Sequence, residues 1–188
     1  MRVVFGKVVW AFGLVIGGGF VRFAGMNYEH ETVPEPGDFR ALPFSRRLPI
    51  YLSGPISVLL LGCCFLGVEQ SVASFMSGFR QFPLFVLAPK TVGVPLMISF
   101  LKTFEASWQI GFGLLCVKMA AYNLLPIPPL SGGGLLLEIE EQIGYRNASS
   151  TSFERFRTGM TLLGFALCCI IFLCTVYVFI RALFLVFS

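Results

Sequence analysis

Three apolar segments, each long enough to cross a lipid bilayer as a helix, limit the folds open to this chain. They cover residues 49–68, 106–125 and 160–185, and a helical span of the hydrocarbon core needs about 20 mainly apolar residues. The composition agrees: 56% of the residues are hydrophobic, only 13% are charged, and the mean hydropathy is +0.81. Soluble domains are about 25% charged. We therefore expect a mainly α, multi-pass integral membrane protein that forms a single domain over residues 1–188.

The N-terminal segment favours a different structure from the three spans. Its apolar stretch, positions 8–21, is too short to cross comfortably as a helix, and runs near that length are more often re-entrant or interfacial. The stretch is rich in β-branched and aromatic residues, and Gly17–Gly19 permits the positive φ angles of a tight reversal. We predict a re-entrant β-hairpin within residues 1–27. A short amphipathic or spanning helix remains the alternative.

The connection between the first two predicted spans is moderately apolar. Residues 69–105 contain Pro83, Pro89 and Pro95 among apolar pieces such as 82–88. We expect this connection to lie against the membrane surface and not to form a folded extramembrane domain.

Positive charge is scattered along the membrane flanks. The net charge is +4, with Arg46 and Arg47 before the first span and Arg155 and Arg157 before the third. Lys and Arg are enriched in short cytoplasmic loops of membrane proteins, so the N-terminal region and residues 126–159 are predicted to be cytoplasmic. The expected location is the plasma membrane or a bacterial inner membrane. Charge of this kind does not indicate a nucleic-acid partner.

The end of the second span cannot continue as a helix. Pro126, Pro128 and Pro129 fall within four positions of the segment 123–134, and each proline removes a backbone donor and clashes with the preceding turn. Unwound backbone at membrane depth is tolerated only where protein or a water-filled cavity satisfies its polar groups. We therefore predict that this segment lines an internal site. The alternative is that it leaves the membrane as an ordinary loop.

This segment resembles the N-x-x-P-x-P-x-L-D-G-G motif of the site-2 protease (M50) family, zinc-dependent enzymes that cut substrates within the membrane. The matching residues are Asn123, Pro126, Pro128, Leu130, Gly132 and Gly133. Gly18–Arg22 is similar to part of the family's membrane-associated β-hairpin, and Gly54-Pro55 resembles the opening of its second core helix. The likeness covers nearly the whole chain. It implies a site-2-protease-like core that lacks its first helix, because the sequence starts where the hairpin would.

The resemblance also implies a zinc site whose ligands this sequence lacks. Active relatives hold zinc with the two histidines of H-E-x-x-H and the aspartate of L-D-G, and the glutamate serves as general base. Ser131 stands at the aspartate position, and the single histidine, His30, has Pro34 where the second histidine would be. We expect no catalytic residue and no metal or other cofactor. Ser131 is expected to cap a helix beginning near Leu135 or to bond within the glycine turn.

Lys118 is unusual because it lies well inside the second predicted span. A charge at that depth is costly and is usually paired or directed toward a polar cavity. Lys118 comes four residues before Tyr122 and five before Asn123, so both Lys118 and Tyr122 are expected near the unwound segment. We hypothesise that the ammonium group borders the space of the absent metal site. A snorkelling lysine or a contact with a partner subunit is the alternative.

These features favour a non-catalytic site-2-protease-like subunit, or pseudoprotease, that acts as a scaffold or assembly factor for a membrane protein complex. Its expected partners are other integral membrane proteins and lipid, with no nucleic acid and no soluble substrate. Two alternatives stay open. One is an active or split intramembrane zinc metalloprotease whose H-E-x-x-H helix lies upstream or on another chain. The other is a transporter or channel component, suggested by the broken helix and Lys118.

Overall fold

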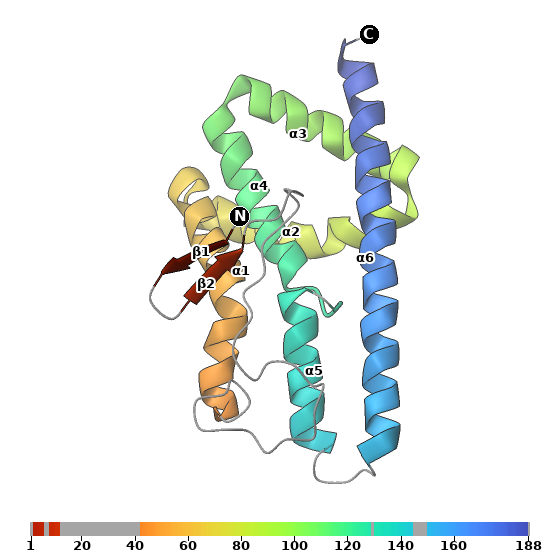
Figure 1. Cartoon of the computed structure of the whole chain (residues 1–188). Helices are drawn as coiled ribbons and strands as arrows, with labels where there is room; N and C mark the ends of the chain where they lie inside the picture. The colour runs from red at the N-terminus through yellow and green to blue at the C-terminus, as the bar shows by residue number, and fades with distance from the viewer. Residues whose placement is uncertain (1, 6–7, 12–41, 129, 145–149, 188) are drawn as a thin grey trace. The chain divides into compact units, whose positions relative to one another are not determined.

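The computed structural model describes residues 2–5, 8–11, 42–128, 130–144 and 150–187, and they are mainly helical. In chain order the elements are β1 Arg2–Phe5, β2 Val8–Ala11, α1 Phe44–Leu66, α2 Val68–Leu87, the short π-helix η2 Pro89–Gly93, α3 Val94–Ala106, α4 Trp108–Asn123, α5 Ser131–Gly144 and α6 Ser150–Phe187 (Figure 1). The chain divides into two units, Met1–Arg47 and Leu48–Ser188.

The N-terminal unit contains a pair of short antiparallel strands. β1 and β2 pair with Val4 opposite Val9, and their valine-rich sequences suit a pleated conformation. The predicted reversal at Gly17–Gly19 lies outside the described residues, as do the rest of residues 12–27. The re-entrant hairpin over residues 1–27 therefore stays a prediction.

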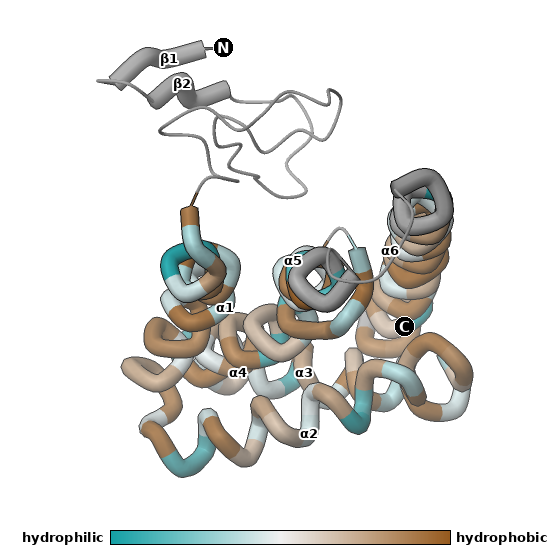
Figure 2. The backbone as a smooth tube through the Cα atoms, turned by 90° about the horizontal axis from the view of Figure 1, so that it is seen from below, coloured by the Kyte–Doolittle hydropathy of each residue, from teal (hydrophilic) through white to brown (hydrophobic). Residues whose placement is uncertain are grey.

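Among the described residues, two helices are long and apolar enough to cross a membrane. They are Phe44–Leu66, with a hydropathy of 1.8, and Thr158–Val186 within α6, with a hydropathy of 2.7. Only 11% and 17% of their most apolar windows are buried inside the protein. Most of their apolar surface therefore faces outward, as expected of helices that contact lipid, and Figure 2 shows apolar residues along both. These helices correspond to the predicted spans 49–68 and 160–185.

The predicted span over residues 106–125 is shorter in the structure. Ser107 has an extended conformation, with φ −156° and ψ 106°, and its side chain accepts a hydrogen bond from the Ile110 backbone N–H at the start of α4. This cap separates α3 from α4, which has 16 residues. A helix of that length rises about 24 Å, whereas the hydrocarbon core is about 30 Å thick. Three complete spans are therefore not confirmed.

Residues 69–105 form helices that run across the direction of α6. They fold as most of α2, then η2 and most of α3 (Figure 1). Gly67 alone joins α1 to α2, with φ 79° and ψ 162°. The placement of this region against a membrane surface stays a prediction.

The core of the second unit is centred on α4, which contacts α2 and α3. Val117 and Ala120 are fully buried, together with Val178 of α6. Small residues allow the helices to approach closely. A Cβ atom at Gly62 of α1 would lie 2.5 Å from the Val117 Cγ2 atom, and one at Gly113 of α4 would lie 2.8 Å from the Leu66 Cγ atom. Close contact through small residues is the usual packing of membrane helices.

The backbone of Gly67 generates the first prediction. Its φ and ψ angles fall in a region that is essentially restricted to glycine, where other residues are strained by about 1–3 kcal/mol. Gly67→Ala should lower the free energy of unfolding by that amount, as measured by denaturant unfolding in mild detergent. Gly54→Ala is the matched control, because a Cβ atom there meets nothing within 4 Å, and it should be neutral or slightly stabilising. Equal stability of the two variants would contradict the strained link.

Candidate functional site

The break between α4 and α5 is the candidate site. α4 ends at Asn123 and α5 begins at Ser131, so the unwound stretch, residues 124–130, is shorter than the predicted 123–134. Turn hydrogen bonds satisfy its backbone donors. Leu125 N donates to Tyr122 O at 3.0 Å, and Ile127 N donates to Leu125 O at 2.8 Å. Leu130 N donates to Ile127 O, also at 2.8 Å, so these backbone N–H groups are hydrogen-bonded within the stretch or to the end of α4.

The first turn of α5 packs directly on the unwound backbone. A Cβ atom at Gly132 would collide with the Leu124 carbonyl group, and one at Gly133 would collide with Pro128 N and the Ile127 carbonyl carbon. On the other side, a Cβ atom at Gly164 of α6 would collide with the Pro128 carbonyl oxygen. The glycines are therefore required by close backbone contact. We call this packed region, residues 124–133 together with Gly164, the α4–α5 joint.

The position of the joint along α6 indicates its depth in a bilayer. Arg155 and Arg181 of α6 are both exposed, and their separation of 26 positions corresponds to about 39 Å of helix. Cys168 lies midway and its Sγ atom is 3.9 Å from the Pro128 carbonyl oxygen. In a membrane crossed by α6, the joint therefore lies near the mid-plane, where unsatisfied backbone groups cost several kcal/mol each.

Ser131 is half-buried and is the first residue of α5. The expectation that it caps a helix beginning near Leu135 is therefore wrong, since the helix begins four residues earlier. The glycines that appeared to be a turn extend the helix instead, and Gly134 N donates to Leu130 O at 2.9 Å.

The donor set of the described residues does not fit a zinc ion. A neutral serine hydroxyl is a poor zinc ligand beside carboxylate, imidazole or thiolate. The described residues contain no group of three or more His, Cys, Asp or Glu side chains placed to hold a metal ion. His30 lies outside the described residues. At the position where the site-2 protease motif has its aspartate, this chain has the hydroxyl group of Ser131, within the α4–α5 joint.

Lys118 is hydrogen-bonded to α2. Its Nζ atom donates to the Ser77 Oγ atom at 2.6 Å, to the Gln81 Oε1 atom at 2.7 Å and to the Ser74 carbonyl oxygen at 3.0 Å. An ammonium group has three N–H donors, so these bonds use all of them. The hypothesis that Lys118 borders the space of the absent metal site stays a prediction. The sequence did not predict that α2, which carries these hydrogen-bond partners, packs beside α4.

Tyr122 lies where α4 meets two other helices. Its ring packs on Phe82 of α2, with centroids 5.1 Å apart and an interplanar angle of 50°, and its hydroxyl group interacts with the Cys168 thiol of α6. Tyr122 therefore supports the joint from the last turn of α4.

Sequence reasoning missed a buried carboxyl group beside the motif. Glu138 of α5 is 1% exposed, and its Oε2 atom accepts a hydrogen bond from the Tyr51 hydroxyl group of α1 at 3.3 Å. The Tyr51 ring also covers Gly134, where a Cβ atom would lie 3.0 Å from the Tyr51 Cε1 atom. The one available signal was an acidic residue following Leu135–Leu137 on an apolar helix. This contact joins α1 to α5.

Comparison with known proteins gives the family. Residues 1–171 match the family model described as Peptidase family M50. The chain therefore belongs to peptidase family M50, as the motif at residues 123–133 indicated.

Similarity to individual proteins is shorter. The chain is 31% identical over 84 residues to a Chlamydia pneumoniae protein, covering 41% of this chain and 13% of that protein. It is 26% identical over 95 residues to a Chlamydia trachomatis serovar D protein, covering 47% of this chain and 15% of that protein. Each is described as a zinc metalloprotease, an assignment that is itself a prediction. The chain thus spans a small part of the length of these relatives. No solved structure matches.

The joint generates a second prediction. Gly133→Ala places a methyl group against backbone atoms of Ile127 and Pro128, and overpacking of this kind typically costs about 1–3 kcal/mol. The variant should unfold at lower temperature in detergent than the native chain. Gly159→Ala, in α6 with nothing within 4 Å of the added Cβ atom, is the control and should unfold at the temperature of the native chain or slightly above it. A Gly133→Ala variant as stable as this control would show that the joint is not closely packed.

The Lys118 cluster generates a third prediction. Lys118→Met removes three hydrogen bonds to α2, and hydrogen bonds to charged groups contribute about 1.5–3 kcal/mol. We expect a loss of stability of that order, measured by denaturant unfolding. Lys102→Met, at an exposed position of α3, should have little effect. If both substitutions had equal effects, the contact between α4 and α2 would not depend on the ammonium group.

Proposed function

We propose that this M50 family member is a non-catalytic membrane subunit, a scaffold or assembly factor that holds other integral membrane proteins through the protease-like core. The observation that carries the proposal is the α4–α5 joint, in which the zinc-ligating aspartate of the family motif is replaced by Ser131. We also propose that the protein is multi-pass, with its N-terminal region in the cytoplasm.

The chemistry of the joint supports the absence of catalysis. A catalytic zinc site uses three protein ligands and keeps one position open for water or substrate. Gly132 and Gly133 bring α5 into contact with the unwound backbone, and Gly164 brings α6 against its other side. A serine hydroxyl group in this joint supplies neither the charge nor the affinity of a carboxylate.

The outer surfaces of the long helices support a role in holding partners. α6 packs through a narrow stripe that includes Gly164, Ile171, Val178 and Ala182. Large apolar side chains elsewhere on α6 are exposed, such as Phe172, which is 66% exposed. Association of membrane helices is driven by van der Waals packing and interhelical hydrogen bonds, so these faces offer surface for the helices of partner proteins.

An active or split protease is the competing proposal, and family membership together with the described activity of the chlamydial relatives favours it. It requires histidine ligands from outside the described residues and a substitute for the aspartate. The two proposals differ in one measurable property, which is metal-dependent peptide-bond cleavage.

The fourth prediction separates these proposals. The full chain, purified in mild detergent with its associated proteins, should not cleave a single-span helical substrate, and a zinc chelator should make no difference. Integral membrane proteins should co-purify in fixed ratio to the chain. Cleavage that the chelator abolishes would establish the active protease instead.

A further inference from the structure

One face of α2 forms an exposed stripe that extends the length of the helix. Its members repeat at intervals of three and four residues, which places them on the same side of a helix. We call this set the α2 stripe: Glu69, Val72, Ala73, Met76, Arg80, Pro83, Leu84 and Leu87, all of them exposed. Met76 is 59% exposed and Leu87 is 81% exposed. Such spacing is typical of a helix that packs against another helix.

The opposite face of α2 is turned into the protein. Ser74, Ser77 and Gln81 accept hydrogen bonds from Lys118 of α4, and Ser71 and Gly78 are buried. The stripe is therefore mainly apolar, and its two ionised side chains are Glu69 and Arg80. Lipid can cover the apolar members at a membrane surface, whereas the two charges are stabilised by opposite charges placed beside them.

The two charges are arranged so that a second copy of the same helix can pair them. They are eleven residues apart, which corresponds to about 16 Å along the helix and to a rotation only about 20° beyond three full turns. A twofold axis between residues 74 and 75 places Glu69 beside Arg80 of the second copy, and Arg80 beside Glu69 of the second copy. Ala73 and Met76 then face each other across the axis. A parallel arrangement would bring like charges together, so the charges select the antiparallel pair.

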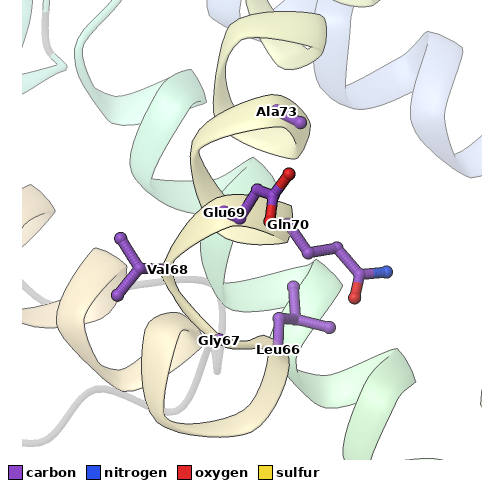
Figure 3. A pocket seen from close by; sticks show the side chains of 6 residues that line it. All are labelled: Leu66, Gly67, Val68, Glu69, Gln70 and Ala73. Carbon is purple, nitrogen blue, oxygen red and sulfur yellow. The ribbon is translucent and has the colours of Figure 1, made fainter.

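The surface beside Glu69 is hollowed. The hollow has a volume of about 500 Å³ and is lined by Leu66, Gly67, Val68, Glu69, Gln70 and Ala73. Figure 3 shows the Glu69 carboxylate and the Gln70 amide projecting from α2 above the link at Gly67. In the antiparallel arrangement this is the place that Arg80 of the second copy reaches. An arginine there has a carboxylate and an amide oxygen as acceptors.

We propose that the protein forms a twofold-symmetric dimer through antiparallel α2 helices, held by the apolar members of the α2 stripe and by two Glu69–Arg80 ion pairs. The partner that this surface fits is a second copy of the chain. The proposal goes beyond the scaffold function and does not depend on whether the chain is catalytic. A dimer presents each exposed face of α1 and α6 twice, so it would hold partner subunits in pairs.

Disulfide cross-linking in native membranes tests the dimer, as the fifth prediction. Cys64 and Cys169 are exposed, so both are first replaced by Ser. Ala73→Cys and Met76→Cys lie close to the proposed axis. In either variant, the two equivalent cysteines of the dimer are separated by only about 4.5 Å along the helix direction. Each should give a covalent dimer on oxidation. Leu87→Cys is the control on the same stripe, because its two copies would be separated by about 37 Å, and it should remain monomeric.

Reversal of the charges tests the ion pairs. In the Met76→Cys background, Glu69→Arg and Arg80→Glu should each reduce the cross-linked fraction by about tenfold, because like charges then face each other. The double variant restores opposite charges and should recover most of the cross-linking. The proposal is overturned if the cysteines near the axis do not cross-link. It is also overturned if Leu87→Cys cross-links equally well, or if the double variant behaves like the single ones.

Discussion

The rest of the structure depends on how the broken helix satisfies its backbone within an apolar environment. Three prolines end α4, and the chain then requires partners for polar groups that a helix would have paired. The turn bonds of Leu125, Ile127 and Leu130 supply part of the answer. Close contact supplies the rest, because Gly132 and Gly133 allow the first turn of α5 to exclude other groups from the unwound backbone. Backbone atoms of α5 therefore pack directly against the unwound stretch.

Helices distant in sequence hold the joint in place. α6 contributes Gly164 against Pro128, and α1 contributes Tyr51, which bonds the buried Glu138 of α5. The polar groups of α2 turn inward to Lys118, which leaves α2 with an outward stripe that carries two opposite charges. Polar groups in the interior are thus hydrogen-bonded between helices, and the exposed face of α2 combines apolar residues with two opposite charges. The interior accommodates Ser131 at the aspartate position of the family motif, and the exterior carries the α2 stripe on which the proposed dimer rests.

The sequence predicted the family, the two long apolar helices and the location of the break, because each depends on local composition or on a short motif. It could not locate the end of α3, where a single capping serine, Ser107, divides an otherwise continuous apolar run. It also misplaced the start of α5. Gly132 and Gly133 were predicted to form a turn, but they belong to the first turn of α5 and pack against the backbone of the unwound stretch. The roles of Lys118 and Glu138 were beyond reach, because their hydrogen-bond partners are 37–44 and 87 residues away in the chain.

If the α4–α5 joint stands where active relatives hold zinc, the native protein should bind no zinc at this site. The full chain would be purified from its own membrane without chelator, and zinc per chain would be measured by elemental mass spectrometry. We expect zinc well below one ion per chain, unchanged in a Ser131→Ala variant. One zinc ion per chain, whether or not the substitution removes it, would show that the protein has kept a metal site.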